Sequence, residues 1–382
     1  MDYSRLFFRA LAAFGCAALL GCVALRAKKL ERWYPPAAPV SAEAGNAPQA
    51  VGANLHYLGC GGFLLEYGGE MLLMDPYFSN MGMIAALTGK MRSDTALINK
   101  FFRERLGSAQ DTAGKISTVL ISHAHHDHLA DVPTLLRNNL SPEKTRVYGS
   151  RTMVNLLRSH PGIVADMAAQ LLDLEKQFSV RSHDPNIKNE PEAGPFVYTS
   201  GRRIRFAAVP SGHAGHYFFW KGHKLPGTEG NVESPLAKPP SRVLQFKEGE
   251  NFNFLIDLLD ESGNPVFRIF SNAGAACDAG VGFPPQYLLQ EKPVDLLLMC
   301  GANYNLAKNY PGALLEHLRP HTVWVAHWEN FFKPIRKLQK RPEVVPNTDI
   351  PKLMRWLEKF SKEKGFPKRI FLEHPLGRAA GF

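Results

Sequence analysis

Residues 122–131 read Ser-His-Ala-His-His-Asp-His-Leu-Ala-Asp, so four histidines and two acids lie within ten positions. They follow the β-branched, apolar run 117–121, which predicts a buried strand. Imidazole nitrogen and carboxylate oxygen are ligands that zinc, manganese and iron accept in proteins. A cluster in this order at a strand end predicts a metal site, and the alternative is a surface cluster of histidines without a specific ion.

The spacing within the cluster predicts two ligand pairs. In the extended chain just past a strand, His123 and His125 are two residues apart and point the same way, so they can bind one metal ion. Asp127 and His128 follow once the chain turns, and they can bind a second ion. His126 faces the other way, so we expect it to lie behind the ligands or to pack in the core.

Apolar runs on both sides of the cluster predict about a dozen strands in two groups, each mixed with helices. Residues 55–74 read as strands joined by glycine-rich turns, and Asp75-Pro76 ends the last of them. The later strands are predicted over residues 204–209, 243–246, 252–258, 266–270, 294–299 and 323–326. Such a set favours two sheets packed face to face with helices outside them.

Helices are predicted over residues 80–106, as two stretches within 150–178, and near the C-terminus. The C-terminal helix has the clearest periodicity, with Leu353, Trp356, Leu357 and Phe360 on one face. Asp349 can cap its first turn, and Gly365 can end it.

The composition indicates a folded, non-fibrous protein. The 382 residues are 45% hydrophobic and 21% charged, which excludes extensive disorder. The five cysteines form no Cys-x-x-Cys pair, so a disulfide scaffold or a cysteine-rich zinc finger is excluded. A formal net charge of +10 favours anionic partners without choosing among membranes, phosphates and nucleic acids.

The N-terminus reads as a targeting segment. Arg5 and Arg9 precede an apolar run over residues 10–25, which is short for a membrane-spanning helix of roughly 20 apolar residues. Leu19-Leu20-Gly21-Cys22 is similar to a bacterial lipobox, in which Cys22 becomes the lipidated first residue. An uncleaved anchor and an accidental apolar leader are the alternatives.

This pattern divides the chain into three parts. Residues 1–22 form the signal or anchor, the proline- and alanine-rich residues 23–53 form a tether, and residues 54–382 form one catalytic domain. A chain of this kind is expected in the bacterial cell envelope, attached to a membrane and facing the periplasm or the exterior.

His-x-His-x-Asp-His after a strand resembles the signature of the metallo-β-lactamase superfamily. Residues 59–76 resemble the opening strands of that superfamily, which end in an acid before proline. Ser211-Gly212-His213 and Ala326-His327-Trp328 resemble its later single-histidine motifs. The resemblance covers roughly residues 54–335 in matching order. Within the superfamily the chain looks closest to the group that includes N-acyl-phosphatidylethanolamine phospholipase D and related bacterial hydrolases.

The resemblance implies an α+β fold, a four-layer αβ/βα sandwich of two mixed sheets flanked by helices, with a dinuclear metal site at one edge. The implied ligands are His123, His125 and His213 for the first metal, and Asp127, His128 and His327 for the second. The family's bridging aspartate is replaced here by Asn272. Its neutral amide binds a cation more weakly, so we expect lower occupancy of the second metal, unless Asp278 reaches the site or Asn272 only shapes a turn.

These residues predict a metal-dependent hydrolase with two divalent ions, zinc or else manganese or iron. A hydroxide generated at the metals would attack an ester or phosphodiester, and Asp127 is the expected catalytic residue. The positive charge, the anchor and the aromatic run 217–220 favour a small-molecule or membrane-lipid substrate. One alternative is a nuclease, although no Arg/Lys-rich arm indicates a nucleic-acid partner. The other is a non-catalytic metal-binding lipoprotein whose site is degenerate at Asn272. No oligomeric state is predicted.

Overall fold

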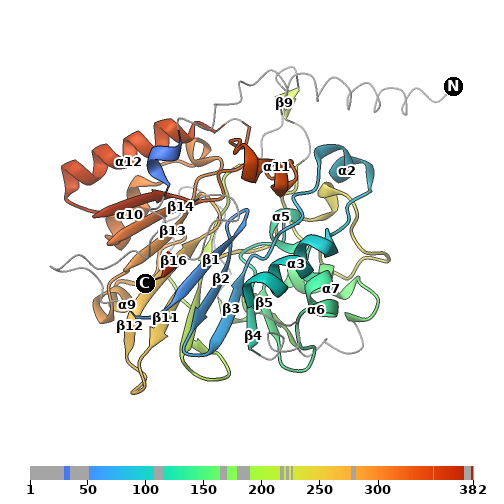
Figure 1. Ribbon diagram of the computed structural model, residues 1–382, viewed down its shortest axis with the longest axis horizontal. Coiled ribbons are helices and arrows are strands. Elements are labelled where there is room, and N and C mark those ends of the chain that lie inside the picture. The colour runs from blue at the N-terminus through green and yellow to red at the C-terminus, as the bar shows by residue number, and fades with distance from the viewer. Residues whose placement is uncertain are drawn as a thin grey trace.

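Two mixed β-sheets face each other and carry helices on their outer faces (Figure 1). The computed structural model describes residues 30–34, 51–106, 115–163, 170–178, 190–215, 219–220, 223–224, 227–276, 281–346, 348–373 and 380–381. Each of the facing sheets has seven strands within these ranges. The α+β sandwich of two mixed sheets predicted from the sequence is confirmed.

The first sheet has the strand order β16-β1-β2-β3-β4-β5-β6. Its strands β3 to β6 run parallel to one another, and the pairs formed by β16, β1, β2 and β3 are antiparallel. The strands are β1 (Asn54–Gly59), β2 (Gly62–Tyr67), β3 (Glu70–Met74), β4 (Ile116–Leu120), β5 (Arg146–Gly149), β6 (Leu171–Asp173) and β16 (Ala380–Gly381).

The second sheet has the order β15-β14-β13-β12-β11-β8-β7 and the same mixed character. Strands β12 to β15 are parallel, and β7, β8, β11 and β12 pair antiparallel. The strands are β7 (Val197–Tyr198), β8 (Ile204–Ser211), β11 (Asn251–Leu259), β12 (Pro265–Asn272), β13 (Leu296–Cys300), β14 (Thr322–Ala326) and β15 (Arg369–Leu372). A separate two-stranded ribbon joins β9 (Phe219–Trp220) and β10 (His223–Lys224).

Helices cover the outer face of each sheet (Figure 1). The α-helices are α2 (Met83–Thr88), α3 (Thr95–Leu106), α5 (His126–Leu129), α6 (Val132–Asn138), α7 (Arg151–Arg158), α9 (Gln286–Glu291), α10 (Gly312–Leu318), α11 (Ile335–Lys340) and α12 (Ile350–Lys364). The 3-10 helices are η2 (Glu31–Trp33), η4 (Leu174–Gln177), η5 (Val243–Gln245) and η6 (Tyr304–Leu306).

The apolar side chains form three main layers, as a four-layer sandwich requires. The middle layer lies between the sheets and contains inward-facing residues such as Phe63, Phe206 and Trp324. A second layer packs the first sheet against α3, α6 and α7, and a third packs the other sheet against α10 and α12. Strands β4 and β13 are buried along their whole length because helices and a facing sheet cover both of their faces.

The C-terminal helix forms where its periodicity predicts, although Trp356, expected on the same apolar face, is 39% exposed. In α12, Leu353, Leu357 and Phe360 are buried against the second sheet. The side chain of Asp349 accepts a hydrogen bond from the backbone N–H of Lys352 (3.0 Å), and Gly365 adopts the left-handed conformation that ends the helix.

Two predicted elements are wrong in type. Residues 243–246 were expected as a strand, but they form the 3-10 helix η5, because β11 already has β8 and β12 as its neighbours. The side chain of Gln245 also accepts hydrogen bonds from the backbone of residues 241 and 242, which stabilises the turn. The second predicted helix of residues 150–178 contains strand β6, which pairs with the open edge of β5.

A buried ion pair joins the central strands of the second sheet. The guanidinium of Arg268 on β12 donates two hydrogen bonds to Asp257 on β11, at 2.6 and 2.8 Å, and both side chains are fully buried. Arg205 on β8 donates to the same carboxylate. Further contacts of Arg268 with the carbonyl oxygens of Leu288 and Lys292 tie α9 to the sheet.

A short segment ahead of β1 packs into the core, although it lies within the predicted tether. Leu30 and Trp33 are buried in the layer beneath α12, and the indole N–H of Trp33 donates to Glu358 (2.7 Å). Residues 30–34 are therefore held against the domain. The predicted signal at residues 1–22 lies outside the described residues, as does the rest of the tether apart from residues 51–53. No helix within the described ranges has the length and apolarity that a membrane crossing needs.

Candidate metal centre

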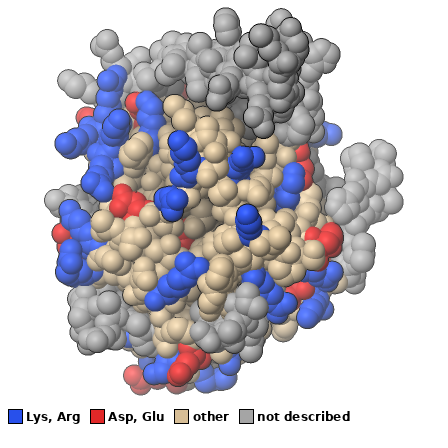
Figure 2. Space-filling model, turned by 90° about the vertical axis from the view of Figure 1, so that its right-hand side faces the viewer, with Lys and Arg blue, Asp and Glu red and all other residues tan. Residues whose placement is uncertain are grey.

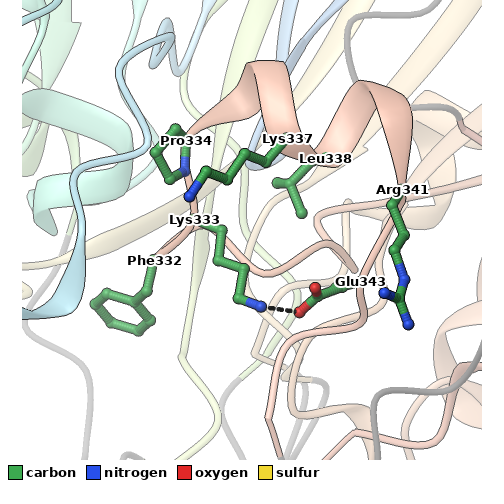
Figure 3. Close-up of a pocket in the computed structure, with 7 residues that line it drawn as sticks. All are labelled: Phe332, Lys333, Pro334, Lys337, Leu338, Arg341 and Glu343. Atoms are coloured by element: carbon green, nitrogen blue, oxygen red, sulfur yellow. Dashed lines mark hydrogen bonds and ion pairs between the residues drawn. The ribbon is translucent and has the colours of Figure 1, made fainter.

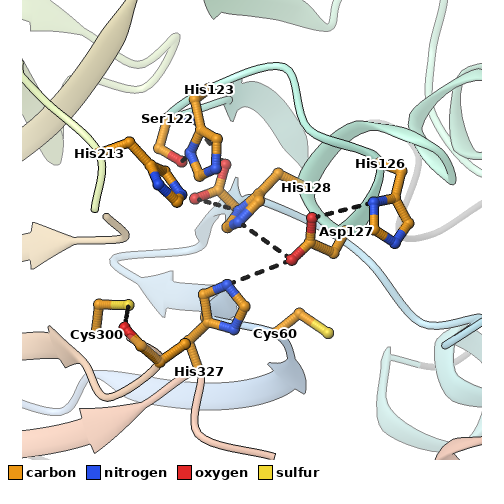
Figure 4. A network of polar contacts seen from close by, with 12 residues as sticks. Cys60, Ser122, His123, His126, Asp127, His128, His213, Cys300 and His327 are labelled. Atoms are coloured by element: carbon orange, nitrogen blue, oxygen red, sulfur yellow. Dashed lines mark hydrogen bonds and ion pairs between the residues drawn. The ribbon is translucent and has the colours of Figure 1, made fainter. Parts of the chain in front are cut away.

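The six histidine and aspartate side chains predicted to bind metal come from three distant parts of the chain and meet at one edge of the sandwich. His123 and His125 follow β4, and α5 carries Asp127 and His128. His213 follows β8, and His327 follows β14. Strand ends place all of them at the same edge, as Figure 4 shows for five of the six.

The side chains form two groups, and in each group the ligand atoms lie within 4.8 Å of one another. The first group is His123, His125 and His213, and the second is Asp127, His128 and His327. The rings of His123 and His128 are 4.0 Å apart between centroids, so the groups adjoin. The sequence-based grouping matches this geometry, although ligation itself remains a prediction.

Polar contacts orient the rings of His123, His128 and His213. The Nδ1 atom of His123 is 2.9 Å from the hydroxyl of Ser122, and Nδ1 of His213 is 2.7 Å from the carbonyl oxygen of Ala214. Nδ1 of His128 lies 3.3 Å from Asp75, whose carboxylate also accepts the backbone N–H of Ser122 (2.7 Å). Partners of this kind fix the orientation of ligand histidines.

The centre has the donors that a metal ion requires. The Nε2 atoms of His123 and His128 are buried and have no hydrogen-bond partner among the described residues. A buried nitrogen without a partner costs folding free energy unless a cation binds it. Burial and the neighbouring histidines hold the pKa of His123 well below its usual range, which keeps its nitrogen available as a ligand. The residues therefore fit two divalent cations.

Asp127 lies at the centre of the second group. Its carboxylate is 3.4 Å from Nε2 of His327 and 3.5 Å from Nδ1 of His126. Burial raises the pKa of Asp127, but the surrounding histidines outweigh burial and leave that pKa well below its usual range. Asp127 is thus an ionised carboxylate in a buried site.

His126 belongs to neither group, as predicted, but its ring does not face the other way, because Nδ1 lies beside the Asp127 carboxylate while the rest of the ring contacts aromatic side chains. It stacks on Phe332 with 5.7 Å between ring centroids and an angle of 24°. Tyr77, Phe246 and Phe331 surround the same ring at 5.9–6.5 Å. Phe331 also lies 5.4 Å from His327, so an aromatic wall borders the centre.

Asn272 ends β12 at the position where the resemblance expects a bridging acid. Its amide group donates to Oδ1 of Asn253 (3.1 Å) and to the carbonyl oxygen of Gly274 (2.7 Å), while its Oδ1 accepts from the hydroxyl of Tyr310 (2.8 Å). The side chain is thus fixed by protein partners. The alternative bridging residue, Asp278, lies outside the described residues.

A buried hydrogen-bond network beneath His327 was not predicted from the sequence. Glu329 is fully buried, and it accepts hydrogen bonds from the hydroxyl of Tyr57 (2.7 Å), the N–H of Cys60 (2.7 Å) and the N–H of Trp328 (3.0 Å). The Tyr57 hydroxyl in turn accepts the backbone N–H groups of His327 (3.0 Å) and residue 61 (3.2 Å). The only sign of this network in the sequence was Glu329, an acid two residues after the predicted ligand His327.

This network holds His327 in an uncommon backbone conformation. His327 has a φ of 52°, in the left-handed region that non-glycine residues rarely adopt. Gly61 lies directly against it, since a Cβ atom on Gly61 would come within 3.3 Å of the Cβ of His327. Because Tyr57 belongs to β1 and His327 follows β14, the network also links the two sheets below the metal centre.

Two facing mixed sheets with His/Asp groups at one edge are the features of metal-dependent hydrolases of the metallo-β-lactamase type. A family model described as "Beta-lactamase superfamily domain" matches residues 71–218. A "UPF0173 metal-dependent hydrolase" of Polynucleobacter asymbioticus is 30% identical over 295 residues, covering 76% of this chain and 80% of that protein. The chain therefore belongs to the metal-dependent hydrolases of the β-lactamase superfamily.

Two solved structures that the chain is similar to are more distant in sequence. Igni18, a metallo hydrolase from Ignicoccus hospitalis, is 15% identical, with 86% of this chain and 98% of that chain covered and a TM-score of 0.45. YhfI, a metallo-β-lactamase fold protein from Bacillus subtilis, is 11% identical, with 87% and 98% covered and a TM-score of 0.40.

Proposed function

We propose that this hydrolase cleaves an ester or a phosphodiester with two divalent cations, zinc in the first instance. The convergence of two three-residue ligand groups at one edge carries the proposal. When bound, the cations would activate water for attack and polarise the substrate oxygen. The absence of a Gly-x-Ser-x-Gly sequence is consistent with a reaction that uses no serine nucleophile.

The protein's own groups have distinct tasks in this proposal. Asp127, ionised and 3.4 Å from His327, would accept a hydrogen bond from the attacking water and hold it in position. Asp75 and Ser122 would keep His128 and His123 turned toward the cations. Asn272, at the position where the resemblance expects a bridging acid, would hold the second cation more weakly than an aspartate.

A membrane lipid or a similar amphiphile is the substrate class we propose. On the described surface, Ile84 and Leu87 of α2 are 70% and 44% exposed, and Leu244 of the adjacent η5 is 49% exposed. Phe246, two residues after Leu244, reaches the ring of His126. Exposed apolar side chains close to a site are typical of surfaces that contact apolar partners.

The positive charge supports the same proposal. Figure 2 shows more Lys and Arg than Asp and Glu side chains around a hollow on the face that lies to the right in Figure 1. An anionic membrane surface would attract such a face. We further propose that the N-terminal segment attaches the protein to the membrane of the bacterial envelope, and that its nearest functional group is that of N-acyl-phosphatidylethanolamine phospholipase D.

Hydrolysis of p-nitrophenyl esters, bis(p-nitrophenyl) phosphate and phospholipid vesicles by the zinc-loaded protein tests this function. We expect turnover of at least one class, its loss with a chelator, and its return with zinc. Asp127→Asn should lower kcat by at least a hundredfold, whereas the same change at Asp260, which lies on an exposed turn, should not. Turnover that survives the chelator would exclude the metal mechanism.

The hydrogen bonds of Asn272 favour one alternative, a metal-binding protein without catalysis. A side chain committed to Tyr310, Asn253 and Gly274 contributes little to a second cation. Counting zinc in the purified protein separates the two functions. Two bound ions per chain support the hydrolase, and a single bound ion without turnover supports the alternative.

A further inference from the structure

A cavity of about 380 Å³ lies beside helix α11, next to the aromatic wall of the metal centre. Figure 3 shows its lining, in which Lys337 and Leu338 lie on the helix, Arg341 follows the last helical residue, and Phe332 and Pro334 stand at the other end. Residues Phe332, Lys333, Pro334, Lys337, Leu338, Arg341 and Glu343 form this lining. The cavity thus combines an apolar base with charged groups at its margin.

The charges in the cavity do not cancel. The ammonium of Lys333 pairs with the carboxylate of Glu343, the one acid in the lining. Lys337 and Arg341 are exposed, and neither has an acidic partner among the ion pairs of the described residues. Two cations therefore remain available to a ligand, and guanidinium groups favour carboxylate and phosphate oxygens.

One aromatic residue separates this cavity from the metal centre. Phe332 lines the cavity and stacks on His126, which lies 3.5 Å from the carboxylate of Asp127. Phe332 also contacts Phe331 (4.7 Å between centroids), and Phe331 contacts His327. A ligand seated on Phe332 would therefore lie alongside the groups that surround the reacting bond.

We propose that this cavity binds the anionic end of the substrate, a carboxylate or a phosphate on an apolar or aromatic body. Lys337 and Arg341 would contact the charged group, and Phe332 with Leu338 would contact the apolar body. The inference rests on the proposed hydrolase, because it gives the same site its substrate class. Position and charge together would make Lys337 and Arg341 specificity-determining residues.

Two esters that differ only in charge test the proposal: 4-acetoxybenzoate is anionic, and 4-acetoxybenzamide is neutral. The full-length, zinc-loaded protein should show a lower KM for the benzoate. The double variant Lys337→Gln/Arg341→Gln should raise that KM on the order of tenfold, as the loss of two partly exposed ion pairs implies, without changing kcat. The KM for the benzamide should stay constant.

Lys340→Gln provides the matched control, since Lys340 is an exposed cation of the same helix outside the cavity lining. It should leave both KM values unchanged, which separates a local site from a general effect of net charge. Calorimetric titration with 4-hydroxybenzoate adds a readout that needs no turnover, and the double variant alone should bind it about tenfold more weakly.

The outcomes separate this inference from the proposed function. If neither ester is cleaved but the titration shows the expected loss in the double variant, the anion site stands and the esterase activity does not. If both esters are cleaved with equal KM, or if the control weakens benzoate binding as much as the double variant, the cavity has no role in recognition and the inference is overturned.

Discussion

Replacing Tyr57 by phenylalanine tests whether the network beneath His327 positions a metal ligand. The change removes one oxygen atom that accepts two buried N–H groups, those of His327 and Gly61, and donates to Glu329. A buried donor without an acceptor costs about 1–3 kcal/mol, so we expect the free energy of unfolding of the metal-free protein to fall by about 3 kcal/mol. Urea denaturation measures this loss.

The same variant should also bind the second zinc ion about tenfold more weakly, because orienting groups around a ligand typically change metal affinity by that order. Competition with a chromogenic chelator measures this affinity. Tyr67→Phe is the matched control, since its hydroxyl is buried and donates a single hydrogen bond to the carbonyl oxygen of Leu259 (3.0 Å) away from the site. It should cost about 1 kcal/mol and leave zinc binding unchanged.

Two results would refute the reasoning. If Tyr57→Phe is no more destabilising than Tyr67→Phe, the two N–H groups do not depend on that hydroxyl. If the variant is destabilised but binds both zinc ions with wild-type affinity, the network stabilises the fold without positioning His327.

Three further changes have expected results. Asn272→Asp places a carboxylate against the oxygen atoms that the amide of Asn272 now contacts, so without zinc we expect the free energy of unfolding in urea to fall by about 2 kcal/mol. With zinc we expect a higher affinity for the second ion. An unchanged zinc affinity would show that Asn272 does not contact the second ion. Burial is the main reason that the pKa of Glu248 rises from 4.5 to about 7, so Glu248 binds its proton more tightly in the folded protein than in the unfolded chain. The protonated Glu248 therefore contributes fully to the free energy of unfolding below pH 4.5, and this contribution, about 2 kcal/mol after allowance for partial exposure, is lost as pH rises through 7. Glu248→Gln should lack this loss when unfolding free energies are compared at pH 4.5 and 8. Arg268→Met leaves the buried carboxylate of Asp257 with Arg205 as its remaining cation partner on the neighbouring strands, and we expect about 3–5 kcal/mol of destabilisation by the same denaturation assay, more than for Arg205→Met.

The fold could be predicted because its strongest signals are local. Buried strands such as β4 and β14 appear as short apolar runs, and α12 carries both its periodicity and its capping residues. The wrong secondary-structure predictions occurred where the availability of a neighbouring strand decides whether a segment forms a strand. Residues 243–246 have strand-forming composition but no free sheet edge, and Leu171–Asp173 became a strand because β5 offered one.

The candidate site could be predicted for a similar reason. His123, His125, Asp127 and His128 lie in one stretch, and each later histidine lies one or two residues past the end of a strand. The groups that hold those ligands were harder to find. Glu329 and Tyr57 are 272 positions apart in the chain and meet only when the two sheets pack together. No local sequence pattern contains that contact.

The docking of Leu30 and Trp33 beneath α12 sets a lower limit on any shortened version of this protein. A fragment that begins at β1 would leave an empty apolar hollow and an exposed Glu358 without its indole donor. Such a fragment should aggregate or lose cooperativity in melting, whereas one that begins a few residues before Leu30 should behave as the parent does. Expression trials aimed at crystals should therefore trim upstream of residue 30 and retain everything after it.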